Sequence, residues 1–136
     1  MPTAAAVASA AVGATAAASA TLAVMSDDPG ATEIDVGRLA ELRQSDGAWV
    51  LDVRQPDEYE AGHVPGAHLI PLDQLGARHQ EVPTDREVYV VCALGGRSAI
   101  ATDALRSAGY RVVNVAGGTQ AWIDAGHPVA KGPDPS

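Results

Sequence analysis

The sequence predicts an α/β domain built on a parallel β-sheet, and three observations lead to this fold class. Short apolar runs alternate along the chain with segments whose apolar residues recur at helical spacing. The apolar runs lack polar alternation, which is typical of parallel strands covered by helices on both faces. The chain has 136 residues, 46% of them hydrophobic but only 4% aromatic, which suits one domain with an aliphatic core.

The first predicted strand–helix unit begins at residues 33–35. Asp35 can cap the following helix, because its carboxylate can accept a hydrogen bond from a free amide of the first turn. Val36, Leu39 and Leu42 share one side of this helix, and we expect that side to face the sheet.

The second unit starts with a buried strand over residues 49–53. Pro56 then suits the first position of a helix, and acidic residues follow it at the positive end of the helix dipole. A loop rich in glycine and proline over 62–66 leads to a short strand over 67–70, and Pro71 opens another short helix.

The third unit begins with residues 87–91, the most strand-like run in the chain. The next helix is expected to start near Arg97–Ser98, with Ser98 as a possible cap, and to stop at Gly109. A strand over 110–115 and a last helix that contains Trp122 complete the pattern. One apolar face is predicted for the helix before Gly109, made of Ile100, Ala101, Ala104, Leu105 and Ala108.

The two ends of the chain differ from this pattern. Residues 1–30 form a low-complexity, alanine-rich leader, which we interpret as disordered or as lying upstream of a true start at Met25. Residues 31–130 form the predicted domain, and residues 131–136 a flexible tail. A cytoplasmic location is expected. Secretion through the leader is the less favoured alternative, because no Lys or Arg precedes Arg38.

Composition and charge exclude several classes of function. The formal net charge of −8 makes non-specific nucleic-acid binding unfavourable, and no run of about 18 strongly apolar residues suggests a membrane span. The single cysteine fits a reducing compartment or a reactive thiol. No metal site is expected, since the histidines lack ligand spacing, and no cofactor is expected, since no nucleotide-binding motif is present.

Cys92, the only cysteine, stands between the strand 87–91 and the following helix. Parallel sheets bind ligands at this end of their strands, where helix amides and the helix dipole lower the pKa of a thiol. Gly95 and Gly96 permit a backbone that turns successive amides inward, and Arg97 adds a positive charge. A reactive thiol in an anion-binding loop is therefore favoured over a buried, inert cysteine.

Several motifs in order resemble the rhodanese (thiosulfate sulfurtransferase-type) family. The loop Cys-Ala-Leu-Gly-Gly-Arg-Ser, residues 92–98, is similar to the active-site loop of that family. The resemblance extends over about residues 32–129. The other matching segments are Leu-Asp-Val-Arg (51–54), Glu58-Tyr59, Gly-His-Val-Pro-Gly-Ala (62–67), Gly117-Gly118 and Trp122.

The resemblance implies a three-layer rhodanese-like fold, with a central five-stranded parallel sheet and helices on both faces. It also implies a sulfurtransferase in which Cys92 takes sulfane sulfur from thiosulfate or a persulfide and passes it to a thiol or cyanide. Because the chain has no second cysteine, the acceptor must be another molecule, such as a thioredoxin-like protein or a low-molecular-weight thiol. The predicted anion-binding loop consists of Ala93, Leu94, Gly95, Gly96, Arg97 and Ser98.

Four further residues are candidates for the site. Arg54 has two equally favoured interpretations, a contact to the substrate and a structural ion pair. Asp52 and Glu58 are interpreted mainly as structural, and His63 mainly as a residue that fixes its loop through backbone hydrogen bonds.

Two alternative functions stay open. Family members with little turnover can serve as regulatory or protein-binding modules. A cysteine phosphatase or arsenate reductase is less favoured, because those loops hold one residue more between Cys and Arg than the four found here. Many thiosulfate-using members carry Arg or Lys in mid-loop, where this chain has Ala93 and Leu94. This difference favours a larger or less charged donor, or a protein persulfide.

Overall fold

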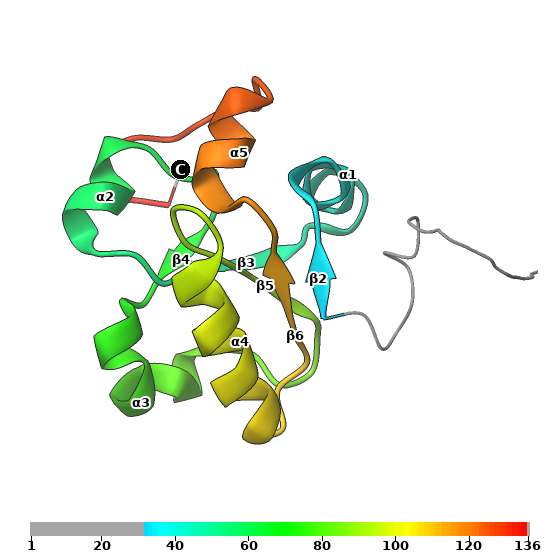
Figure 1. The fold of residues 1–136 in the computed structure, drawn as a ribbon, viewed down its shortest axis with the longest axis vertical. Coiled ribbons are helices and arrows are strands. Elements are labelled where there is room, and N and C mark those ends of the chain that lie inside the picture. Colours follow the sequence, from blue (N-terminus) through cyan, green and yellow to red (C-terminus); the bar gives the residue numbers. More distant parts are fainter. Residues whose placement is uncertain (1–31, 136) are drawn as a thin grey trace, which may run out of the picture. The chain divides into compact units, whose positions relative to one another are not determined.

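A computed structural model describes residues 32–135, so the predicted leader and Met25 lie outside the described residues. The described part contains a five-stranded sheet with strand order β2-β6-β5-β3-β4, and every neighbouring pair is parallel (Figure 1). This confirms the predicted fold class. The strands are β2 (Glu33–Ile34), β3 (Trp49–Asp52), β4 (His68–Leu69), β5 (Val88–Val91) and β6 (Val112–Val115).

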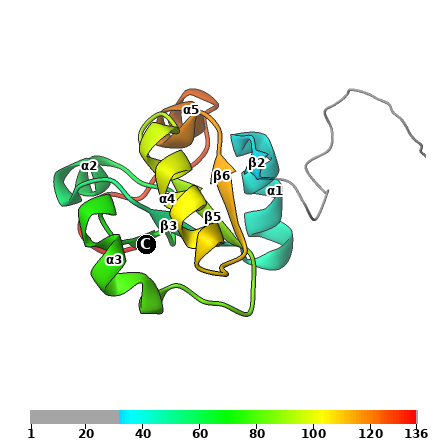
Figure 2. The ribbon, with the colours of Figure 1, turned by 60° about the horizontal axis from the view of Figure 1, so that its bottom comes forward.

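Helices cover both faces of this sheet. Packing of buried side chains places α1 and α5 on one face and α3 and α4 on the other, an arrangement that can be followed in Figure 2. The helical segments are α1 (Val36–Asp46), α2 (Pro56–Ala61), η1 (Leu72–Gln74), α3 (Leu75–Arg78), η2 (His79–Glu81), α4 (Gly96–Ser107) and α5 (Gly118–Asp124). None of these helices is long and apolar enough to cross a membrane.

Strand β5 shows why its sequence lacks polar alternation. Tyr89 and Val91 pack into one buried cluster, which includes Trp122 of α5, whereas Val88 and Val90 pack into the cluster on the α4 side. Each face of the central strand is therefore buried against a helix layer, and every position in β5 is apolar or aromatic. The carboxyl end of this rigid strand carries the cysteine.

The predicted buried face of α4 is wrong in part. Ala101 and Leu105 are buried as predicted, but Ile100 is 61% exposed, and Ala104 and Ala108 are exposed as well. The helix instead turns Ser98 and Thr102 toward the protein. Both hydroxyls have local partners, namely the Cys92 sulfur for Ser98 and the Ser98 carbonyl for Thr102, so burying them costs little.

The start of α4 also differs from the prediction. Gly95, with φ of 113°, is the N-cap residue, and the helix begins at Gly96. Ser98 therefore lies within the first turn and does not cap the helix, which leaves its hydroxyl free to reach the sulfur of Cys92.

Candidate active site

Cys92 follows β5 directly, at the centre of the sheet's carboxyl edge. Asp52, the last residue of β3, is paired in register with Val91, so the residues after both strands meet at this edge. Only 1% of the Cys92 surface is exposed. The loop that begins here passes into α4 close to the start of α5 (Figure 1).

The Cys92 sulfur accepts hydrogen bonds from its own loop and from α4. The amide of Gly95 lies 3.0 Å from Sγ, and the hydroxyl of Ser98 lies 3.4 Å away. Burial raises the pKa of the Cys92 thiol, but hydrogen bonds from the Ser98 hydroxyl and from the amides of Ser98, Gly95 and Leu94 outweigh it. The net effect lowers the pKa, so the thiolate fraction at neutral pH exceeds that of an ordinary cysteine.

The first turn of α5 is hydrogen-bonded to the backbone of the Cys92 loop. The amide of Thr119 donates to the Cys92 carbonyl at 2.8 Å, and that of Gln120 donates to the Ala93 carbonyl at 3.0 Å. Gly118 has φ of 59°, and a Cβ there would clash with the Cys92 carbonyl and lie 2.8 Å from the Ala93 carbonyl oxygen. The resemblance pointed to this glycine, but only the structure gives its physical reason.

Asn114 of β6 is a site residue that the sequence analysis missed. Its side-chain amide donates to Glu33 at 3.1 Å and lies 3.4 Å from the carbonyl oxygen of Gly95. The one available signal was a single buried polar residue within the run Val-Val-Asn-Val.

Arg97 is bound by a carboxylate. Its Nη1 and Nη2 donate to the two carboxylate oxygens of Glu58 at 2.7 and 2.9 Å. This pairing lowers the pKa of Glu58 to about 2 and raises the pKa of Arg97. Glu58 also accepts the Gln55 amide in the capping box of α2, so the ion pair ties α4 to α2.

Arg54 and Asp52 form a buried ion pair. Arg54 Nε lies 3.0 Å from one carboxylate oxygen of Asp52, and its terminal nitrogen lies 2.8 Å from the other. The same terminal nitrogen donates to the carbonyl of Gly62 at 2.9 Å. Asp52 is fully buried, and the Arg54 side chain is 7% exposed. Of the two interpretations of Arg54, this geometry is that of the structural ion pair.

His63 lies fully buried between α2 and the C-terminal segment. Its ring nitrogens lie 2.8 Å from the Tyr59 carbonyl and 2.9 Å from the Pro135 carbonyl, and its ring stacks on that of Tyr59. The Pro135 carbonyl also accepts the Gly66 amide at 2.8 Å. These contacts suit a residue that fixes its loop, and they involve the segment for which the sequence predicted a flexible tail.

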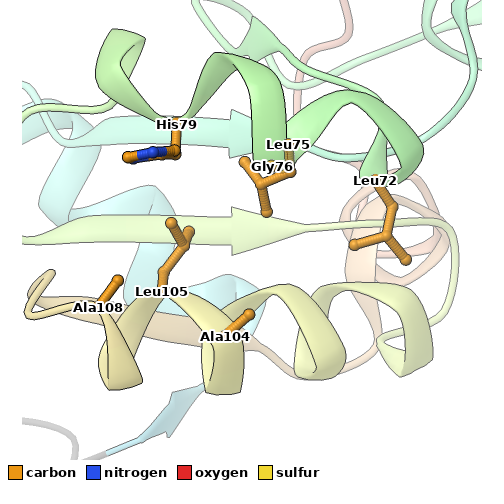
Figure 3. A pocket seen from close by; sticks show the side chains of 7 residues that line it. All are labelled: Leu72, Leu75, Gly76, His79, Ala104, Leu105 and Ala108. Atoms are coloured by element: carbon orange, nitrogen blue, oxygen red, sulfur yellow. The ribbon is translucent and has the colours of Figure 1, made fainter.

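A separate apolar groove of about 290 Å³ lies between α3 and α4 (Figure 3). No residue of the Cys92 loop lines this groove. Its one histidine, His79, is hydrogen-bonded through Nδ1 to the Tyr110 hydroxyl at 2.8 Å. The residues that line this groove are Leu72, Leu75, Gly76, His79, Ala104, Leu105 and Ala108.

Within residues 32–135, no group of three or more His, Cys, Asp or Glu could hold a metal ion.

Comparison with known proteins agrees with this geometry. A family model described as a rhodanese-like domain matches residues 35–125. A protein named Sulfurtransferase from Allochromatium vinosum is 36% identical over 99 residues, which cover 71% of this chain and 92% of that protein. The Bacillus subtilis protein YqhL is 43% identical over 76 residues, or 55% of this chain and 60% of that protein. The chain thus spans less than two thirds of this second relative.

The fold also matches solved structures. The crystal structure of a rhodanese-related protein from Thermoplasma volcanium has a TM-score of 0.68 and 36% sequence identity, over 72% of this chain and 96% of that chain. The match therefore spans almost all of that chain.

Proposed function

The chain belongs to the rhodanese-like domain family, and on that premise we propose that it is a sulfurtransferase that carries sulfane sulfur on Cys92. The observation that supports this most strongly is the hydrogen bonding of the thiol. Amide and hydroxyl donors converge on Sγ, and they lower the pKa of the thiol despite its burial. A sulfur-based nucleophile needs this environment.

The first half-reaction loads the cysteine. The Cys92 thiolate attacks the outer sulfur of the donor, the sulfur–sulfur bond of the donor breaks, and the rest of the donor leaves with the bonding electron pair. The product is a Cys92 persulfide. We expect the donors that lower the pKa of the thiol to help stabilise the anionic persulfide as well.

The second half-reaction returns the thiolate. An external thiolate or cyanide attacks the outer sulfur of the persulfide, and the electrons of the broken bond return to Cys92 Sγ. Because Cys92 is the only cysteine in the sequence, the acceptor thiol comes from another molecule. A thioredoxin-like protein or a low-molecular-weight thiol has the required chemistry.

Burial of the thiol sets a condition on this cycle. Because only 1% of Cys92 is exposed, the loop must move to uncover Sγ before a donor sulfur can reach it. Gly95 and Gly96 provide two positions without side chains at the point where this movement is needed.

A turnover assay tests the proposal. The full chain is incubated with cyanide and either thiosulfate or glutathione persulfide, and thiocyanate is measured, with Cys92→Ser as the matched control. Thiocyanate formation that depends on Cys92 with at least one donor is the expected result. No Cys92-dependent thiocyanate with either donor would contradict the proposal and favour a binding module. Cys92-dependent hydrolysis of a phosphate ester would favour the phosphatase alternative.

A further inference from the structure

Both arginines of the candidate site, Arg97 and Arg54, are already paired with carboxylates. Arg97 gives both of its terminal nitrogens to Glu58, and Arg54 is buried against Asp52. Each arginine and its carboxylate together carry no net charge. The formal charge of the whole chain is −8, so its long-range field repels anions as well.

The groups that do contact the sulfur are neutral. The amides of Leu94, Gly95 and Ser98 and the Ser98 hydroxyl stabilise one negative charge on one atom. They are already engaged with Sγ, and they offer no free cation for a second anionic group that lies beside the transferred sulfur.

Leu94 is the apolar, exposed side chain of the loop, two residues after Cys92. Its amide is among the groups that lower the pKa of the Cys92 thiol, and its side chain starts two bonds from that nitrogen. The side chain is 72% exposed, whereas the thiol two residues before it is nearly buried. A donor whose outer sulfur reaches Sγ therefore brings its next atoms against an apolar surface.

We infer that the sulfur donor is a thiol persulfide, R–S–SH, rather than the thiosulfate dianion, and that Leu94 is the specificity-determining residue. This inference rests on the proposed sulfur transfer. Behind its outer sulfur, thiosulfate carries a sulfonate whose three oxygens share negative charge, and placing this group against leucine without a cation is unfavourable. A persulfide carries a two-coordinate sulfur and a carbon chain there, which suit an apolar contact.

The transfer from a persulfide is balanced. The Cys92 thiolate forms a bond to the outer sulfur of R–S–SH, and the bond between the two donor sulfurs breaks. R–S⁻ leaves with the electron pair and takes up a proton from water, and Cys92 keeps the sulfur as S–SH. No metal, oxidant or further reductant takes part.

The test compares rates at which donors load Cys92, followed by intact mass in single-turnover experiments. The donors are thiosulfate, mercaptoethanol persulfide and persulfidated albumin. Mercaptoethanol persulfide is a small donor whose carbon chain carries no charge, and persulfidated albumin is a protein-borne donor. The variants are the wild type, Leu94→Lys and Leu94→Gln. Ile123→Lys adds the same charge at another exposed apolar position, outside the loop.

We expect the wild type to load faster from at least one persulfide than from thiosulfate. Leu94→Lys should raise the thiosulfate rate about tenfold, and added salt should reduce this gain. Leu94→Gln, which removes the apolar surface without adding a charge, should raise the thiosulfate rate less than Leu94→Lys does. Ile123→Lys should leave that rate within about threefold of the wild type. A faster albumin reaction identifies a protein-borne donor, and a faster mercaptoethanol reaction a small one.

Two results would overturn the inference. One is a wild type that loads from thiosulfate as fast as from both persulfides. The other is a Leu94→Lys variant whose thiosulfate rate is no higher than that of Ile123→Lys. In both cases Cys92 would still load, so the proposed sulfur transfer would stand. Failure of every donor to load Cys92 would instead refute the proposed function itself.

Discussion

Arg97 and Glu58, 39 residues apart in the sequence, form a bidentate ion pair at the start of α4, with N–O distances of 2.7 and 2.9 Å. The pair connects the loop that carries Cys92 to helix α2. It fixes the direction in which the backbone leaves the loop, and it occupies the only charged side chain that the loop contains. Arg97 therefore helps to position the loop, and its charge also interacts with that of Cys92.

This ion pair should make stability depend on pH in the acid range. The pKa of Glu58 is about 2 in the folded protein against an ordinary 4.5, so the folded state binds fewer protons between these values. The resulting stabilisation is fully present above about pH 4.5 and is lost as the pH falls toward about 2. Urea unfolding at a series of pH values should show the wild type's advantage over Glu58→Gln shrinking in this window. If that advantage is the same size in an Arg97→Met background, the ion pair is not its cause.

The Ser98 hydroxyl should contribute to the acidity of the thiol. Its hydrogen bond to Cys92 Sγ is lost in Ser98→Ala, and one hydrogen bond of about 1 kcal/mol corresponds to somewhat less than one pKa unit. We expect the midpoint of the pH dependence of iodoacetamide alkylation to rise by up to about one pH unit. Ser107→Ala, at the far end of the same helix, provides the control. A midpoint in Ser98→Ala that equals the control's would show that the Ser98 hydroxyl does not lower the pKa of Cys92.

A side chain at Gly118 should be more destabilising than backbone strain alone would make it, because it would also clash with the loop. Gly118→Ala adds a clash with the loop carbonyls to the cost of a positive φ, whereas Gly126 has φ of 83° with open space around it. Gly126→Ala should lower the free energy of unfolding by roughly 1–2 kcal/mol, the ordinary cost of the left-handed region. Gly118→Ala should cost clearly more and should also alter the alkylation rate of Cys92. Equal costs for the two variants would argue against close packing of α5 on the loop.

Arg54 should matter for stability rather than for donor binding. Arg54→Met leaves the fully buried carboxylate of Asp52 without its partner, and breaking such a pair typically costs about 3 to 5 kcal/mol. The double variant Asp52→Asn/Arg54→Met should regain part of this loss in urea unfolding. A variant Arg54→Met with normal stability and a raised KM for the donor would show that Arg54 is a substrate contact instead.

Local patterns in the sequence were enough to predict the sheet. All five strands, the helices between them and the position of Cys92 follow from apolar runs and turn residues, because these record which backbone segments are buried. The Asp35 cap is also confirmed, with the Arg38 amide donating to its carboxylate at 2.8 Å.

Contacts between distant segments could not be predicted in this way. Nothing local marks Glu58 as the partner of Arg97, or the amides of Thr119 and Gln120 as donors to the loop carbonyls. The face of α4 was mistaken because counting apolar residues ignores hydroxyls that find partners nearby, as those of Ser98 and Thr102 do.

The most direct test of sulfur transfer is the mass of the intact chain after incubation with a sulfane-sulfur donor. If Cys92 carries sulfane sulfur, the chain gains the mass of one sulfur atom, and this gain is absent from Cys92→Ser and disappears when cyanide or a thiol is added. A chain whose mass stays unchanged with thiosulfate and with every persulfide donor, or which gains sulfur equally in Cys92→Ser, would contradict this role of Cys92.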